Sequence, residues 1–347
     1  MRAAIIGAGS LGTIIGALMA KAGRPVDLID TNREHVAALN RDGARIIGEM
    51  DLTVPVQALT PEDMTGQYDL VFLLSKQTAN QAVLTHLLPF LHAESTVCTL
   101  QNGIPEPSVA AVIGQGRTIG GAVGFGATWI GPGVSRLTTT AEATRKFAFE
   151  IGEMDGQMRP HLTAAQQYLS CVGQTDLLDD LMGIRWSKLL MNATFSGMSA
   201  ALGCSFGEVL DDPRALLCVA FIADETVHAA HAAGHRMAPM QGENFERFAL
   251  NSSASIPEVL PLIRKIWSQH RQLRASMLQD LEKGRDTEIG FINGIVCKTG
   301  RAQGLATPFN DLVVELVGAA QAARSVPDFA NIDRFGDLLR PHLAFLD

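Results

Sequence analysis

The order of apolar and polar positions divides the chain into two parts of different character. In the first part, short apolar runs alternate with stretches in which apolar residues recur every three to four positions, as expected for strands alternating with helices. From residue 176 onward there is no convincing strand pattern, and helical periodicity runs through residues 183–203, 212–234, 256–283, 287–303 and 309–324. The pattern predicts an α/β fold, with a doubly wound sheet over residues 1–175 followed by an all-helical domain over residues 176–347.

The first predicted strand leads directly into a glycine-rich turn. Residues 3–6 are apolar, Gly7-Ala8-Gly9-Ser10-Leu11-Gly12 follows, and a helical pattern continues to Gly23. In this context Gly7 permits a tight turn, Gly9 lets a pyrophosphate approach the backbone, and Gly12 lets the helix lie close to the strand. The helix N-terminus also attracts phosphate. An ordinary glycine-rich turn is the alternative, but strand, motif and helix together predict a Rossmann-type dinucleotide-binding domain.

A second apolar run, residues 25–29, ends at Asp30. An acidic residue about 20 positions after the glycines accepts hydrogen bonds from the adenosine ribose and repels a 2′-phosphate. Asp30 therefore favours NADH over NADPH, although Arg33 lies close by. Asp30, Thr31 or Asn32 could also cap the following helix, and capping is compatible with ribose binding.

Two further apolar runs end in polar residues. Residues 68–74 precede Ser75 and Lys76, and residues 96–100 precede Gln101 and Asn102. Ligands of an open parallel sheet bind at the carboxyl ends of its strands, so we expect Lys76 and Asn102 at the binding edge. A solvated lysine is the alternative. The remaining strand patterns, which suggest short strands or a hairpin and later an antiparallel excursion around a turn at 130–133, cover residues 44–60, 118–124, 134–138 and 147–151.

Composition narrows the class of protein. The chain has 347 residues, 47% of them hydrophobic, which is enough for two cores. Its net charge is −8 without a basic cluster, so we expect neither nucleic acid nor a membrane surface as partner.

The longest apolar run, residues 215–223, is half a membrane span, and a strand starting at residue 3 leaves no room for a signal peptide. Five scattered cysteines without a C-x-x-C pair favour free thiols in the cytoplasm.

The helical part carries two groups of polar residues on otherwise apolar helices. Lys188, Asn192 and Ser196 are spaced i, i+4 and i+8, which places them on one face of an α-helix. The second group is Ser276-Met277-Leu278-Gln279-Asp280 followed by Thr287-Glu288 and Asn293-Gly294. A solvated helix face is the alternative for each. The substrate pocket and any acid or base are expected here, because a nucleotide domain supplies neither.

One further cluster has helical spacing that would suit a metal. It consists of Glu225, His228, His231 and His235. The helix around these residues is rich in alanine, which is typical of packing, and no second cluster completes a site. The sequence therefore predicts no metal.

The sequence resembles the ketopantoate reductases (2-dehydropantoate 2-reductases) over nearly its whole length. The resemblance rests on the Gly7–Gly12 motif, Lys76, Gln101-Asn102-Gly103, Lys188 to Asn192, and above all the block from Ser276 to Gly294. It implies NAD(P)H-dependent reduction of ketopantoate to pantoate, in pantothenate biosynthesis, with NADPH the cofactor implied by the family and NADH the one favoured by Asp30.

The resemblance also implies residue roles. Lys188 would donate a proton to the substrate carbonyl, and Glu288 would lie beside it and near the cofactor. The implied cofactor contacts are Gly7, Ala8, Gly9, Ser10, Leu11, Gly12, Asp30, Lys76, Asn102, Glu288 and the backbone near Ala127. The implied substrate contacts are Asn102, Lys188, Asn192, Ser196 and Ser276.

Several positions depart from the family pattern. Ser196 and Phe206 stand where asparagine is common, and Asp30-Thr31 stands where an arginine for the 2′-phosphate is common. Residues 237–270 include extra sequence, whose expected role is to cover the site or to form an interface. These departures keep open an NAD-dependent 2-hydroxyacid dehydrogenase for branched or aromatic 2-keto acids. A non-catalytic dinucleotide sensor would not need Lys188 and Glu288 together. A homodimer is a further hypothesis.

Overall fold

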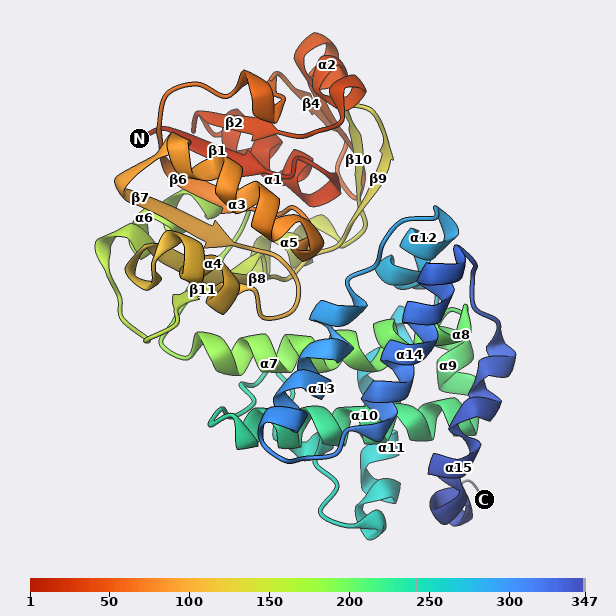
Figure 1. The fold of residues 1–347 in the computed structure, drawn as a ribbon. Helices are drawn as coiled ribbons and strands as arrows, with labels where there is room; N and C mark the ends of the chain where they lie inside the picture. The colour runs from red at the N-terminus through yellow and green to blue at the C-terminus, as the bar shows by residue number, and fades with distance from the viewer. Residues whose placement is uncertain (241, 346–347) are drawn as a thin grey trace. The chain divides into compact units, whose positions relative to one another are not determined.

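A computed structural model describes residues 1–240 and 242–345. The chain forms two compact units, one from Met1–Gln101 with Pro105–Leu181 and the other from Asn102–Ile104 with the chain from Met182 onward. The first unit is an α/β structure and the second is helical (Figure 1). The predicted fold class, a Rossmann-type sheet followed by helices, is therefore confirmed.

The first unit is built on an eight-stranded sheet in the order β12-β11-β8-β7-β6-β1-β2-β5. All neighbouring strands are parallel except β11 and β8, which are antiparallel. The strands are β1 (Ala3–Ile6), β2 (Val26–Ile29), β5 (Gln57–Leu59), β6 (Tyr68–Leu73), β7 (Leu91–Thr99), β8 (Thr118–Val123), β11 (Phe149–Glu153) and β12 (Thr175–Leu178).

Alternate residues of β1 enter two separate cores, because successive strand side chains point to opposite faces. Ala3 and Ile5 belong to the core that includes residues of α1 and α6, and Ala4 and Ile6 to the core that includes residues of α3 and α4. The helices of this unit are α1 (Ser10–Lys21), α2 (Arg33–Asp42), α3 (Asn80–Leu87), α4 (Glu106–Ile113), α5 (Ala141–Lys146) and α6 (Pro160–Leu169). The apolar run of residues 3–6 is explained by burial on both faces.

A smaller four-stranded sheet, in the order β4-β3-β10-β9, packs against α1. Its strands are β3 (Ala44–Gly48), β4 (Leu52–Val54), β9 (Ala127–Gly131) and β10 (Val134–Leu137). The predicted turn at residues 130–133 is too long, since β9 continues to Gly131. The prediction of no strand beyond residue 175 is also wrong, because β12 extends to Leu178. β12 is an edge strand of four residues with only one fully buried, so it lacks a clear apolar signal.

The second unit consists of helices around α10. They are α7 (Leu181–Met191), α8 (Gly197–Leu202), α9 (Phe206–Asp211), α10 (Pro213–Ala232), α11 (Ile256–Trp267), α12 (Ser276–Glu282), α13 (Asn293–Ala302), α14 (Pro308–Ala323) and α15 (Gly336–Leu339). α10 is long and apolar enough to span a membrane by composition, but 72% of its most apolar stretch is buried inside the molecule. It packs against α9, α11, α13 and α14, as a core helix does.

The predicted helix over residues 256–283 is two helices, α11 and α12. The chain between them has a capping role, because the carbonyl groups of Leu273 and Arg271 accept the N–H groups of Phe206 and Gly207 at the start of α9. The apolar periodicity of the sequence continues across this break because both helices bury an apolar face. The short helices α9 and α15 were not predicted.

Candidate active site

The three glycines of the first turn have three different surroundings. Gly7 has a φ of +92°, and a Cβ there would lie 2.5 Å from the backbone nitrogen of Ser75. A Cβ on Gly12 would run into the Gly7 carbonyl oxygen, whereas a Cβ on Gly9 would meet no atom within 4 Å. Gly7 and Gly12 are thus required by the fold, and Gly9 leaves an open approach to the backbone at the start of α1. No side chain caps α1, which begins at Ser10, so the loop fits a pyrophosphate.

His35 supports this loop and was not predicted from the sequence. It is 1% exposed, and its Nδ1 accepts the Gly133 N–H at 2.9 Å. Nε2 therefore carries the proton and donates to the Ala8 carbonyl oxygen at 2.8 Å, where Thr13 Oγ1 also donates at 2.7 Å. His35 ties the glycine turn to the smaller sheet. The only sequence signal was a histidine on the inward face of the helix over residues 33–42.

Asp30 is half-buried at the end of β2, and it does not cap α2. The cap is Asn32, whose side chain accepts the His35 N–H at 3.0 Å. Asp30 Oδ1 accepts the Asn32 N–H at 2.9 Å. Arg33 forms an exposed ion pair with Glu62 at 3.4 Å. Of the three capping alternatives, the structure selects Asn32.

The carboxyl ends of β6 and β7 are joined by Gln101. Its Nε2 donates to the Ser75 carbonyl at 2.5 Å and to Asn80 Oδ1 at 2.6 Å. Lys76, directly after Ser75, is half-buried, and Asn102, directly after Gln101, is exposed. The buried glutamine therefore fixes the backbone next to both predicted residues. No feature of the sequence distinguished Gln101 from its neighbours, although it lies in the quoted motif.

Ala127 lies apart from the large sheet. It is the first residue of β9, half-buried, and it pairs with Leu137 of β10 in the smaller sheet. Since β9 and β10 both pack against α1, Ala127 lies in the sheet that packs on the helix following the glycine turn.

Lys188, Asn192 and Ser196 lie on a helix that is not α-helical throughout, so the predicted continuous α-helix is wrong. α7 ends at Met191, and a π turn, Asn192–Ser196, leads into α8. In an α-helix, a residue four positions further along lies slightly beyond one full turn. In a π turn, which has more residues per turn, a residue four positions further along lies slightly short of one full turn. The two angular offsets have opposite signs, so Ser196 lies on the same side of the helix as Lys188. In a continuous α-helix Ser196 would lie about 80° from Lys188.

Exposure sets these residues apart from the rest of the helix. Residues 183–202 are buried except for Lys188, Met191, Asn192 and Ser196, which are half-buried and which we call the accessible stripe. The Asn192 Nδ2 atom is itself buried and has no hydrogen-bond acceptor among the described residues. A buried amide without a partner costs about 1–3 kcal/mol, so the stripe is suited to a ligand that supplies an acceptor. π turns also occur often at functional sites.

Ser276 is the exposed first residue of α12, which packs against the π turn and α8. The preceding residue fixes its position, because the Ala275 N–H donates to Ser199 Oγ at 3.2 Å. Ser199 Oγ in turn donates to the Cys204 carbonyl at 2.5 Å. The hydroxyl of Ser276 is thus carried by a helix end that is anchored to α8.

Glu288 is half-buried and immediately precedes the 3₁₀ helix Ile289–Phe291. Its neighbour Thr287 is anchored to α14, since both its N–H and its hydroxyl donate to Gln321 Oε1, at 2.8 and 2.9 Å. On the other side the Phe291 N–H donates to the Glu288 carbonyl at 2.8 Å. The backbone of Glu288 is therefore held from both directions.

Phe206 is part of an aromatic cluster behind the stripe. It is 8% exposed, and its ring lies 5.4 Å from that of Phe195 in the π turn. Phe195 stacks on Trp267 at 4.8 Å, and Trp267 contacts Phe248. The extra segment of residues 237–270 supplies Trp267, Phe248 and Phe245, so these aromatic residues pack in the core and do not form a cover.

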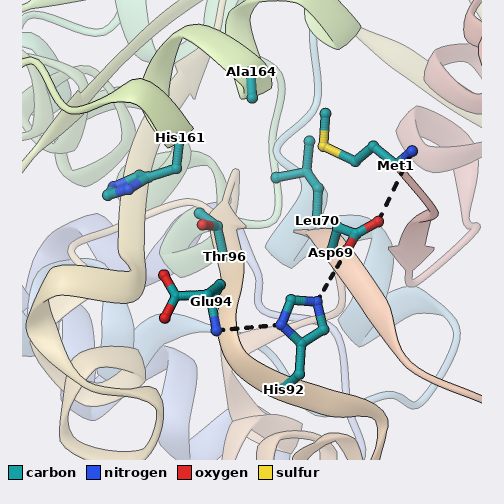
Figure 2. Close-up of a pocket in the computed structure, with 8 residues that line it drawn as sticks. All are labelled: Met1, Asp69, Leu70, His92, Glu94, Thr96, His161 and Ala164. Carbon is teal, nitrogen blue, oxygen red and sulfur yellow. Dashed lines mark hydrogen bonds and ion pairs between the residues drawn. The ribbon is translucent and has the colours of Figure 1, made fainter.

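The first unit also has a hollow of about 370 Å³, shown in Figure 2. His92 lies there between Asp69, 3.0 Å from its Nε2, and the backbone N–H of Glu94, 3.2 Å from its Nδ1. The residues that line the hollow are Met1, Asp69, Leu70, His92, Glu94, Thr96, His161 and Ala164. His161 and Ala164 belong to α6 and the others lie on or next to β1, β6 and β7, and none of them is a predicted site residue.

Three of the four residues considered for a metal have separate partners. Glu225 accepts N–H groups of α14, His228 contacts Asp224 at 3.0 Å, and His231 contacts Glu246 at 2.6 Å. Over residues 1–240 and 242–345 no group of three or more His, Cys, Asp or Glu side chains is placed to hold a metal ion.

Comparison with known families matches both units. Residues 3–155 match the family described as "Ketopantoate reductase PanE/ApbA", and residues 180–321 match "Ketopantoate reductase PanE/ApbA C terminal". The chain belongs to the ketopantoate reductase family.

Two relatives are similar to the chain over nearly its whole length. The 2-dehydropantoate 2-reductase of Pyrococcus horikoshii is 27% identical over 331 residues, which cover 93% of this chain and 98% of the relative. The enzyme of the same name from Archaeoglobus fulgidus is also 27% identical, with 92% and 98% covered.

Solved structures share the fold. A PanE/ApbA family ketopantoate reductase from Ralstonia eutropha has a TM-score of 0.79 at 24% identity, with 93% of this chain and 99% of that chain covered. A D-mandelate dehydrogenase in a ternary structure with NADH and anilino(oxo)acetate has a TM-score of 0.78 at 23% identity, with the same coverage.

Proposed function

We propose that the chain is a 2-dehydropantoate 2-reductase, which reduces ketopantoate to pantoate with NAD(P)H. Family membership makes it an oxidoreductase of 2-keto acids. The observation that carries the proposal is the accessible stripe, which combines a lysine with a buried asparagine amide lacking an acceptor. A lysine can supply a proton, and an amide N–H can bind a carboxylate or carbonyl oxygen.

The residues present fit a nicotinamide dinucleotide. The open backbone at Gly9 and the uncapped start of α1 support pyrophosphate binding by Gly7, Ala8, Gly9, Ser10, Leu11 and Gly12. Asp30 is assigned to the ribose, while Lys76, Asn102, Glu288 and the backbone near Ala127 are assigned to further cofactor contacts. When bound, the reduced nicotinamide supplies a hydride to the keto carbon. A carboxylate at Asp30 favours NADH, because it would repel a 2′-phosphate.

In the proposed mechanism Lys188 acts on the substrate carbonyl oxygen. Negative charge develops on this oxygen during reduction, and the Lys188 ammonium stabilises the charge and delivers the proton. Glu288 is proposed to orient the ammonium. Asn192, Ser196, Ser276 and Asn102 are assigned to the substrate, with the Asn192 amide donating to one of its oxygens.

A second candidate keeps this chemistry and changes the substrate to a branched or aromatic 2-keto acid reduced by NADH. It is favoured by Asp30 and by Phe206, which stands where an asparagine is common in the family. Phe206 is 8% exposed and contacts the Phe195 ring, and its side chain offers no hydrogen bond to a substrate hydroxyl. A pocket built for a substrate hydroxyl rejects analogues that lack it, whereas this pocket would discriminate less.

We also assign the enzyme to the cytoplasm. Cys98, Cys171, Cys204, Cys218 and Cys297 all lie in the described part of the chain, and none forms a disulfide. Reduced cysteines are typical of that compartment.

An absorbance assay at 340 nm tests the proposal. NADH and NADPH are each run against ketopantoate, 2-ketoisovalerate, 2-ketoisocaproate and benzoylformate. We expect kcat/KM to be highest for ketopantoate. Higher values for the acids without the hydroxyl would support the second candidate, and turnover of none of the four would contradict both.

A further inference from the structure

One backbone carbonyl of the π turn accepts a hydrogen bond from a distant side chain instead of from the helix backbone. In an α-helix the Gly197 N–H would donate to the Ala193 carbonyl, but here it donates to the Asn192 carbonyl. The Ala193 carbonyl accepts a hydrogen bond from Asn293 Nδ2 at 2.9 Å. Asn293 is the first residue of α13 and is fully buried. A side chain 100 positions away thus binds the turn at the point where it departs from α-helical bonding.

A chain of hydrogen bonds fixes the orientation of the Asn293 amide. The Glu225 carboxylate accepts from Asn310 Nδ2 at 2.7 Å, which leaves Asn310 Oδ1 as an acceptor. Asn310 Oδ1 accepts the second Nδ2 proton of Asn293 at 2.9 Å. The Asn293 Oδ1 atom is buried without a donor among the described residues. Both Nδ2 protons of Asn293 are therefore used in hydrogen bonds. If the amide were flipped, its Oδ1 would face the Ala193 carbonyl oxygen and Asn310 Oδ1, and neither of these can donate a hydrogen bond.

Gly197 provides the space for this contact. A Cβ on Gly197 would lie 2.7 Å from Asn293 Oδ1 and 3.0 Å from its Nδ2. Any larger residue would displace the amide from the π turn. Gly197 and Asn293 therefore act as a pair, one making room and the other filling it.

We propose that Asn293 is a positioning residue for the keto-acid site: by holding the π turn at Ala193, it keeps Ser196 in line with Lys188. The proposal rests on the assignment of Ser196 to the substrate. Asn293 acts through the backbone of the π turn, at the Ala193 carbonyl. When the contact is lost, the turn is free to rewind to an α-helix, and the Ser196 hydroxyl leaves the line of the stripe.

The test is a double-mutant cycle with Ser196. In the wild-type background, Asn293→Leu should raise the keto-acid KM about tenfold, lower kcat less, and leave the dissociation constant of NADH within twofold. In a Ser196→Ala background, Asn293→Leu should change KM by less than twofold, because the group it positions is already gone. Equal effects in the two backgrounds would overturn the proposal, since a merely structural role would be additive.

A matched control comes from α8. Asn331 Nδ2 donates to the Ala201 carbonyl at 2.9 Å, so Asn331→Leu removes the same kind of bond from the same run of helix without reaching the π turn. We expect its KM to stay within twofold of wild type. If Asn293→Leu does not fold, Gly197→Ala replaces it, because the added methyl displaces the amide without removing it, and the same rise in KM is expected.

Hydrogen–deuterium exchange gives a readout that needs no activity. Peptides over residues 188–200 should exchange at least fivefold faster in Asn293→Leu than in wild type, and unchanged exchange would overturn the proposal. If the wild type reduces none of the four keto acids, the proposed function fails, and exchange still decides whether Asn293 holds the turn.

Discussion

Glu225 on α10 and Asn310 on α14 are joined by two hydrogen bonds to one carboxylate oxygen: Glu225 Oε2 accepts the backbone N–H of Asn310 at 2.9 Å and its side-chain Nδ2 at 2.7 Å. The other oxygen accepts the Phe309 N–H at 2.9 Å. The carboxylate thus caps α14 and also orients the amide chain that leads to the π turn. The buried Glu225 carboxylate therefore both stabilises the start of α14 and orients the side-chain amides of Asn310 and Asn293.

Glu225 makes stability depend on pH. Burial raises its pKa from 4.5 to about 7, against the three hydrogen bonds, which lower the pKa. Between these values the folded protein retains a proton that the unfolded chain has released, so the free energy of unfolding falls as pH rises from about 4.5 to about 7. The full shift corresponds to roughly 3 kcal/mol.

Denaturant titrations at pH 5, 6 and 7 check this prediction on wild type and Glu225→Gln. The variant should lose most of the decline, because its amide does not titrate. The titratable groups that interact with or adjoin this site, Asp224 and Cys218 on α10, Cys297 on α13 and Asp311 on α14, are the same in both proteins. An equal decline in the variant would assign it to Asp224, whose pKa burial also raises.

Gly9 and Gly7 should respond to alanine in opposite ways. A Cβ at Gly9 meets no atom, so Gly9→Ala should keep the melting temperature within about 2 °C yet weaken NADH binding at least tenfold. Gly7→Ala places a side chain at φ +92° against Ser75, so it should lower the melting temperature by several degrees. Thermal melts and NADH fluorescence titrations separate the two effects. Unchanged NADH affinity in Gly9→Ala would remove the pyrophosphate from this loop.

Lys188→Ala should lower kcat by about 10²–10⁴-fold, which is typical of a lost general acid. Met191 lies on the same stripe, and its side chain has no proton to donate to the substrate. Met191→Ala is therefore the control and should retain kcat within about threefold. Steady-state kinetics with saturating cofactor measure both. Near-normal kcat in Lys188→Ala would exclude this residue as the proton donor.

Asp30→Asn should shift cofactor preference toward NADPH, because the amide does not repel a 2′-phosphate. We expect the ratio of kcat/KM for NADH to that for NADPH to fall at least tenfold. Asp42 at the exposed end of α2 serves as a charge control, since Asp42→Asn makes the same change in net charge away from the glycine turn. A similar shift in both variants would mean that overall charge, and not ribose recognition, sets the preference.

Sequence patterns located the elements that have strong local signals. The glycine turn could be recognised because its strand, motif and helix are continuous in the chain, and Lys188, Asn192 and Ser196 because regular spacing marked them. The π turn could not be predicted, since the side chain that binds its Ala193 carbonyl belongs to Asn293, 100 positions away in the sequence. His35 was missed for the same reason, because its role depends on Gly133.

The break between α11 and α12 shows a different limit. Apolar periodicity reports which residues are buried, and both helices bury such residues, so the pattern continued across the chain that caps α9. The structure shows that α11 ends at Trp267, that Ser268–His270 form a 3₁₀ turn, and that Arg271 and Leu273 accept hydrogen bonds from the start of α9.

The aromatic cluster has a consequence for engineering. Trp267 of the extra segment stacks on Phe195, which is next to Ser196 at one end of the stripe. Ser187, which is next to Lys188 at the other end, donates a hydrogen bond to the Ala238 carbonyl at 2.6 Å. The extra segment therefore buttresses the stripe from behind at both of its ends. A change in this segment would therefore reach the stripe from a distance, through packing and without altering any residue assigned to the substrate.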